Sequence, residues 1–124
     1  MKFLILSSIL ALATAVSAFT GPATFLLPTG KAGTCGYAIS SGDFAVALNP
    51  SDYASGAHCG KAISVTYMGN TITTIVQDEC SSCGPHGIDL IARTWKAITE
   101  TAAAPGITFL TEPGITVNLT WAFL

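Results

Sequence analysis

Charged residues are scarce in this chain. They make up 10% of its 124 residues, with 5 Lys and Arg against 7 Asp and Glu, and the formal net charge is −2. A weakly acidic chain without a basic cluster does not attract a nucleic-acid backbone or an anionic lipid surface. We therefore expect no nucleic-acid partner and no membrane partner.

Long apolar runs are lacking beyond the first residues. Lys2 is followed by an apolar run over residues 3–16, and Val16-Ser17-Ala18 has small residues where a signal peptidase reads the chain. This run is too short to cross a bilayer. The sequence predicts a signal peptide at residues 1–18 and a secreted, extracellular protein with one domain at residues 19–124.

A second Cys-x-x-Cys pair is also missing. The four cysteines are Cys35, Cys59, Cys80 and Cys83. An even number in a small secreted chain indicates two disulfides, and the count alone leaves three pairings open. Zinc held with His58 and His86 is an alternative, and a thioredoxin-like redox pair is another. The oxidising compartment and the absence of a surrounding βαβ pattern disfavour both. We expect no metal and no cofactor.

Short strand-like segments dominate the rest of the chain. They are rich in Val, Ile, Thr and aromatic residues and are bounded by turn signals, at 23–27, 44–48, 63–68, 71–77 and 115–123. Gly69-Asn70 separates two of them and predicts a hairpin turn. Residues 115–123 alternate apolar and polar, as in a half-buried strand. The pattern predicts a mostly-β barrel.

Helical signals are few. Asn49-Pro50 looks like a helix start with Pro at the first position. Residues 90–100 place apolar side chains at helical spacing, and Asp89 precedes them as a natural N-cap. We expect one or two short helices in the barrel.

Asp78 and Asp89 form the most informative pair in the sequence. They lie eleven residues apart, and the segment between them holds Cys80-Ser-Ser-Cys83 and a Gly-Pro-His-Gly run. Two carboxylates flanking a rigid loop are suited to acid/base chemistry on a carbohydrate or to hydrogen bonding with its hydroxyls. The structural alternatives are a helix cap for Asp89 and a solvated turn carboxylate for Asp78.

Other candidate residues carry weaker signals. Phe25, Tyr37 and Tyr53 could stack on sugar rings, although packing is the more common fate of a single aromatic residue. His86 has no Ser or free Cys nucleophile at a recognisable spacing, which disfavours a catalytic triad. Asn118-Leu-Thr is an acceptor sequon that makes Asn118 a candidate for N-glycosylation.

Six motifs in order resemble the double-psi β-barrel family. This family includes the rare lipoprotein A-like proteins, the first domain of expansins, barwin and the small fungal expansin-like proteins called loosenins. The single-domain fungal members are the most similar. The resemblance covers nearly all of residues 19–124 and implies a six-stranded double-psi β-barrel. The motifs are Gly21-Pro-Ala-Thr-Phe25, Thr34-Cys-Gly36, Phe44-Ala-Val-Ala-Leu-Asn-Pro50, Cys59-Gly-Lys61, Val76-Gln-Asp-Glu-Cys80 and Ile88-Asp-Leu90, with Val117-Asn-Leu-Thr-Trp121 at the end.

The resemblance implies roles for the aspartates and the cysteines. Asp78 matches the aspartate that follows the central hairpin in expansins. Asp89 matches the aspartate that serves as catalytic acid in the endoglucanases that share this barrel. The family pattern also implies a Cys35–Cys59 bridge, which leaves Cys80–Cys83 as the second.

The chain departs from the hydrolytic pattern on its predicted first strand. The related endoglucanases carry their catalytic base there, whereas this strand reads Ala23-Thr-Phe-Leu-Leu27 and has no carboxylate. Leu26 stands where expansins have Thr, and Ile91 replaces the usual Ser. An inverting hydrolase without its base cannot activate water. This favours a protein that is not a hydrolase.

We therefore expect a secreted, monomeric, expansin-like protein that binds and loosens cell-wall polysaccharide of the cellulose or chitin type. Asp78, Asp89, Phe25 and Tyr37 are the expected binding residues. One alternative is a lytic glycosidase or transglycosylase that uses Asp89 as its acid. The other is a protein-binding module, such as a protease inhibitor or a secreted effector.

Overall fold

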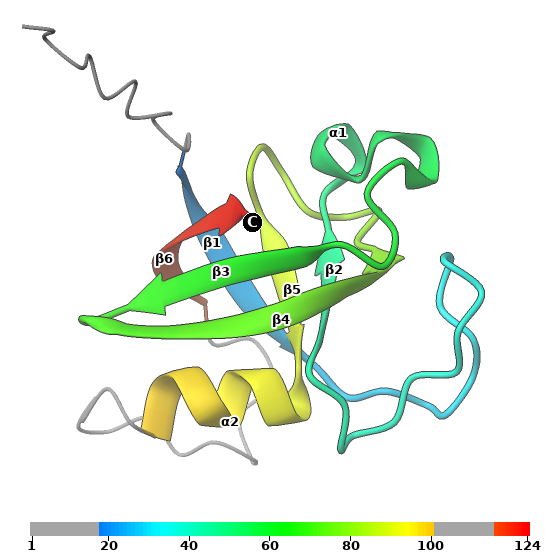
Figure 1. The fold of residues 1–124 in the computed structure, drawn as a ribbon, viewed down its shortest axis with the longest axis horizontal. Helices are drawn as coiled ribbons and strands as arrows, with labels where there is room; N and C mark the ends of the chain where they lie inside the picture. The colour runs from blue at the N-terminus through cyan, green and yellow to red at the C-terminus, as the bar shows by residue number, and fades with distance from the viewer. Residues whose placement is uncertain (1–17, 101–115) are drawn as a thin grey trace, which may run out of the picture.

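Six strands close into a barrel with two short helices outside it (Figure 1), which confirms the predicted fold class. The computed structural model describes residues 18–100 and 116–124. Around the barrel the strands follow the order β1-β5-β2-β4-β3-β6. The elements are β1 (Phe19–Leu26), β2 (Ala45–Leu48), α1 (Pro50–Tyr53), a 3-10 turn η1 (Ala54–Gly56), β3 (Ala62–Tyr67), β4 (Asn70–Glu79), β5 (Ile88–Ile91), α2 (Ala92–Glu100) and β6 (Val117–Phe123). In this part of the chain, no helix is long and apolar enough to span a membrane.

Two pairs of strands are parallel, β1 with β5 and β2 with β4, and the other four pairs are antiparallel. Parallel neighbours need long crossover connections. The segment at residues 27–44 joins β1 to β2, which β5 separates in the barrel; it runs outside the barrel and lies beside the end of β4 (Figure 1). This segment forms one wall of the candidate site.

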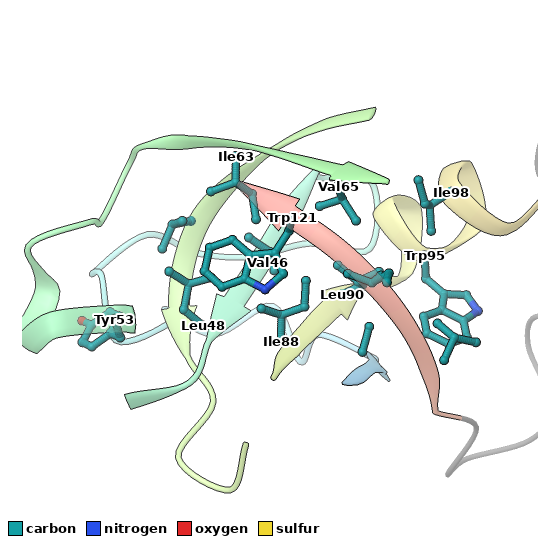
Figure 2. Close-up of a cluster of buried hydrophobic side chains, with 14 residues drawn as sticks. Val46, Leu48, Tyr53, Ile63, Val65, Ile88, Leu90, Trp95, Ile98 and Trp121 are labelled. Carbon is teal, nitrogen blue, oxygen red and sulfur yellow. The ribbon is translucent and has the colours of Figure 1, made fainter. Parts of the chain in front are cut away.

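The barrel interior is filled by apolar side chains from every strand (Figure 2). Trp121 on β6 is its largest fully buried side chain. Helix α2 packs against the barrel through Trp95 and Ile98, which are 2% and 0% exposed. The hydroxyl of Thr94 on α2 accepts from the backbone N–H of Ala45 at 3.0 Å and donates to its carbonyl at 3.1 Å. The helix is thus joined to β2 by both packing and hydrogen bonds.

The predicted hairpin and the predicted first helix are both present. Strands β3 and β4 are joined by Met68 and Gly69, whose φ angles are 47° and 80°, and Tyr67 pairs with Asn70. The turn therefore lies one residue earlier than the sequence predicted. Asn49 caps α1, because its side-chain oxygen accepts from the N–H of Asp52 at 3.1 Å.

Asp89 does not cap a helix, and this prediction is wrong. Residues 88–91 form strand β5, and α2 begins only at Ala92. Ile88, Leu90 and Ile91 are completely buried. A short buried strand that runs directly into a helix shares its apolar character, so periodicity alone does not separate them. The predicted signal peptide, apart from Ala18, and residue 115 of the last predicted strand lie outside the described residues.

Candidate functional site

A β-bulge in β4 decides which way Asp78 faces. Val46 of β2 pairs with Val76 of β4, but the next residue, Ala47, pairs with Asp78, so Gln77 is the extra residue. In a regular ladder Gln77 would pair with Ala47, and Asp78 would lie opposite Leu48, whose side chain is in the core. Bulges commonly redirect a side chain in this way. Here the bulge turns Asp78 to the outer face of the barrel.

Asp78 and Asp89 then lie in one row across four strands. Asp78 pairs with Ala47, Ala47 pairs with Asp89, and Asp89 pairs with Thr24 of β1. Residues directly paired in a sheet point to the same face. Ala47, whose side chain is a single methyl group, is the one residue between the two aspartates in the row. The two aspartates singled out in the sequence are thus brought together by strand pairing.

Asp78 is held firmly by its surroundings. Its Oδ1 accepts from the backbone N–H and the hydroxyl of Thr34, both at 2.7 Å, and from the N–H of Glu79 at 2.8 Å. Gly33 brings the loop close, because a Cβ at that position would come within 2.9 Å of the Asp78 carboxyl carbon. One carboxylate oxygen is therefore occupied by the protein, which leaves Oδ2 for an external donor.

Asp89 has the opposite environment. Among the described residues, no hydrogen-bond donor contacts its carboxylate, although the side chain is about half buried. Burial raises the pKa of the Asp89 carboxyl above its ordinary value, and the negative charge of Asp78 raises it further. The structure thus pairs a fixed carboxylate with one that holds its proton more tightly.

Two surface hollows flank the row. A hollow of about 220 Å³ lies beyond Leu26 and Ile91, toward the 27–44 segment, and includes Asp78 and Lys31 in its lining. A second hollow, of about 230 Å³, lies on the other side, where Pro22, Thr24 and Thr116 meet the disulfide loop. Because Leu26, Thr24 and Pro22 alternate along β1, these hollows lie on either side of the Asp89–Thr24 pair. Together they outline a track that crosses both aspartates.

The two disulfides support this track from opposite sides. Cys35 is bonded to Cys59 and Cys80 to Cys83, which is the pairing that the family resemblance implied. The first bond fixes the segment that carries Thr34. The second lies beside Asp89, whose carboxylate lies within 4.8 Å of both sulfurs. All four cysteines are in disulfides, so none offers a thiolate ligand to zinc.

The predicted aromatic residues occupy different places. Phe25 pairs with Leu90, packs against the core and lies 6.0 Å from the ring of Trp95, so it faces away from the aspartates. Phe25 thus lies on the core face of β1 and not in the row with Asp78 and Asp89. Tyr37 is 59% exposed and belongs to the turn in which the N–H of Gly33 donates to the Tyr37 carbonyl. It stays available for stacking, whereas Tyr53 is buried at 6%.

Two threonines at the site were not singled out from the sequence. Thr24 is the direct neighbour of Asp89, and Thr34 supplies two of the hydrogen bonds to Asp78. The period-two pattern of β1 could have placed Thr24 on the outer face. No local signal indicates that Thr34 meets a residue 44 positions away.

The two histidines lie away from this row. The Nδ1 of His86 is 3.0 Å from the Oδ2 of Asp52, and its ring stacks on Phe19. The ring of His58 packs on Phe123, and its Nδ1 lies 2.6 Å from the carbonyl of Asp52. Both act as packing residues near α1.

Comparison with known proteins finds one curated relative and several solved structures with a similar fold. No family model matches the chain. A curated protein, the allergen Asp f 7 homolog of Arthroderma benhamiae, is 35% identical over 77 residues, which is 57% of this chain and 26% of that protein. The chain thus spans about a quarter of the length of this relative.

Three solved structures show the same architecture. Clavibacter michiganensis expansin matches with a TM-score of 0.66 and 20% identity over 87% of this chain and 50% of its own. An aspartate-to-asparagine mutant of that expansin, in complex with cellohexaose, matches with a TM-score of 0.68 and 19% identity, over the same shares of the two chains. The Streptomyces papain inhibitor matches with a TM-score of 0.64 and 24% identity, over 89% of this chain and 97% of that protein. The chain therefore has the double-psi β-barrel fold of the expansin-like proteins.

Proposed function

We propose that this protein is a secreted, monomeric, expansin-like protein that binds cell-wall polysaccharide of the cellulose or chitin type along the Asp78–Asp89 track and loosens it without hydrolysis. The observation that carries the proposal is the row of Asp78, Ala47, Asp89 and Thr24 on the outer face of the barrel. A structural neighbour with the same fold holds cellohexaose, which supports a polysaccharide as the ligand.

The two aspartates contribute differently to binding. Asp78 acts as a fixed acceptor for a sugar hydroxyl, because Thr34 and Glu79 already orient its carboxylate. Asp89 accepts a hydrogen bond when ionised and donates one when protonated. Its raised pKa extends the pH range in which it can donate. Tyr37 provides the exposed aromatic face for stacking.

The proposal of binding without hydrolysis follows from the neighbours of Asp89 in the row. On one side is Ala47 and on the other is Thr24, and neither can serve as a catalytic base. The carboxylate of Asp78 has one oxygen occupied by three protein donors. An inverting glycosidase needs a second carboxylate free to activate water. The site therefore supports binding of a polysaccharide better than hydrolysis of its glycosidic bonds.

The test is a pull-down on insoluble cellulose, chitin and peptidoglycan, with product analysis of the supernatant. Loss of one hydrogen bond to a charged group costs about 1.5–3 kcal/mol, so Asp78→Asn and Asp89→Asn should each bind roughly tenfold or more weakly. Asp43→Asn, an exposed carboxylate outside both hollows, is the matched control and should bind as the wild type does. Tyr37→Ala should weaken binding without changing the products.

Two results would overturn the proposal. New reducing ends or anhydro-sugars that appear with the wild type and vanish with Asp89→Asn would make the protein a lytic enzyme. Equal binding by the wild type and both aspartate variants would show that the row of Asp78 and Asp89 takes no part in polysaccharide recognition.

A protein-binding function is the second candidate. The Streptomyces papain inhibitor is matched over 97% of its length, whereas the expansins are matched over half of theirs. A single-domain barrel could thus be a complete inhibitor. Inhibition of papain that survives both aspartate substitutions would favour this candidate, and its absence alongside polysaccharide binding would exclude it.

A further inference from the structure

The outer face of β6 presents a second functional feature, centred on Asn118. Asn118 is exposed, and among the described residues its side chain has no hydrogen-bond partner. It begins the sequon Asn118-Leu119-Thr120. The side chain of a modified Asn must reach solvent in the folded protein, and this one does. The disulfides indicate the oxidising secretory environment in which N-glycosylation takes place.

An exposed methionine, Met68, lies next to this asparagine. Thr66 of β3 pairs with Thr120, and because the strands are antiparallel the next outward position of the hairpin, Met68, comes opposite Asn118. Met68 is 61% exposed. Asn118, Met68 and Tyr67 line a shared hollow of about 240 Å³, whose other lining residues include Thr20 and Thr66. An exposed methionine beside an unpartnered asparagine suits a group that is apolar on one side and polar on the other.

We propose that Asn118 carries an N-linked glycan and that the first sugar, N-acetylglucosamine, packs over Met68 in this hollow. The acetamido methyl group and the apolar face of the ring suit Met68 and Tyr67. The sugar hydroxyls suit the threonine side chains that line the hollow. A glycan directed over Met68 leaves the two aspartates uncovered, although Asn118 borders the second hollow of the track. Asn118 pairs with Pro22, which lines that hollow and lies two residues along β1 from Thr24, about 7 Å at the usual rise of a strand.

The modification is tested on protein secreted from a eukaryotic host. Intact mass before and after peptide N-glycosidase should differ by the mass of a glycan, and peptide mapping should place an aspartate at position 118 after the treatment. Asn118→Gln and Thr120→Val should both remove the glycan. Thr120→Ser, which keeps the sequon and the hydroxyl, should retain it. An unmodified Asn118 in the secreted wild type overturns the proposal.

The packing of the glycan is tested by oxidation of Met68, which is the only methionine after Met1. Methionine oxidation follows exposure, so peroxide should oxidise Met68 about threefold or more slowly in the glycosylated protein than in the enzyme-deglycosylated protein. The Asn118→Gln variant should oxidise at the faster rate, and Thr120→Ser at the slower one. Equal rates with and without the glycan would show that the sugar does not cover Met68 and would refute this part of the proposal.

Discussion

The end of β4 around Asp78 and the middle of β5 around Asp89 differ sharply, although the two residues lie in one row. Asp78 is tied by three hydrogen bonds to the 27–44 segment and its own strand. Asp89 has no such partner among the described residues and has a raised pKa. The same side-chain chemistry therefore gives a rigid acceptor at one position and a desolvated, titratable group at the other. The difference comes from the surrounding structure.

The bulge that creates the row should be the most sensitive feature. Insertion of one alanine between Gln77 and Asp78 would place Asp78 opposite the buried Leu48 or break the second half of β4. Because a buried, unpaired carboxylate is costly, we expect a loss of about 3 kcal/mol or more in the free energy of unfolding. Thermal unfolding followed by circular dichroism measures it. Gln77→Ala keeps the residue count and should cost no more than about 1 kcal/mol, and an equal effect of both changes would contradict the bulge argument.

The Cys35–Cys59 bond is the next largest contribution on the Asp78 side. Its sequence separation is 24 residues, and for a loop of this size the loop-closure model gives about 3 kcal/mol. The double variant Cys35→Ser/Cys59→Ser should show this loss in urea denaturation and should weaken polysaccharide binding by loosening Thr34. The Cys80–Cys83 bond closes a far shorter loop. Its removal in the double variant Cys80→Ser/Cys83→Ser should therefore lower the free energy of unfolding by less than about 2 kcal/mol. The reverse order of the two losses would refute this prediction.

Truncation of Asp78 should show how much its hydrogen bonds contribute to the stability of the fold. Asp78→Ala leaves the Thr34 and Glu79 donors without their acceptor, and we expect a loss of about 2 kcal/mol in the free energy of unfolding. Asp78→Asn keeps an acceptor oxygen and should lose less. Denaturant titration of the three proteins checks the order. If Asp78→Ala were as stable as the wild type, the view of Asp78 as a structural tie would be wrong.

Asp89→Asn should have the smallest effect on stability and the opposite sign. Burial raises the pKa of Asp89 above 3.8 in the folded state, so the folded protein holds this proton more tightly than the unfolded chain. The stability that Asp89 contributes is complete below its ordinary pKa and is lost as pH rises through the raised value. Asn stays neutral, so the Tm of the variant should exceed that of the wild type at neutral pH. The gap should close as pH falls towards 3.8, and Tm profiles that stay parallel across this range would contradict the assignment.

Much of the fold could be predicted from the sequence because its signals are local. The alternation over β6, the Asn49-Pro50 helix start and the β3–β4 hairpin each depend on neighbouring residues, and all three are present. The boundary between β5 and α2 could not be predicted, because Leu90 and Ile91 are buried in a strand and fit a helical stripe equally well. Helix α2 itself is buried through Trp95 and Ile98, as the spacing indicated.

The candidate site was only partly predictable. Asp78 and Asp89 stood out because charges are few and a Cys-x-x-Cys loop joins them. Phe25 could not be assigned to a face from its short apolar strand, and it points to the core. Thr24 and Thr34 lie within two of the family motifs, but the motifs assigned them no role. Their roles come from pairing with Asp89 and from hydrogen bonding to Asp78.

The amino-acid sequence by itself determined the barrel class, the two aspartates, the sequon and the cysteines available for bonding. Only the tertiary structure decided that Asp78 faces outward beside Asp89, that Thr34 holds it and that Phe25 turns inward. The face on which a strand residue lies depends on its register with its neighbours. That register depends on a one-residue bulge and on packing between segments far apart in the chain, neither of which local sequence encodes.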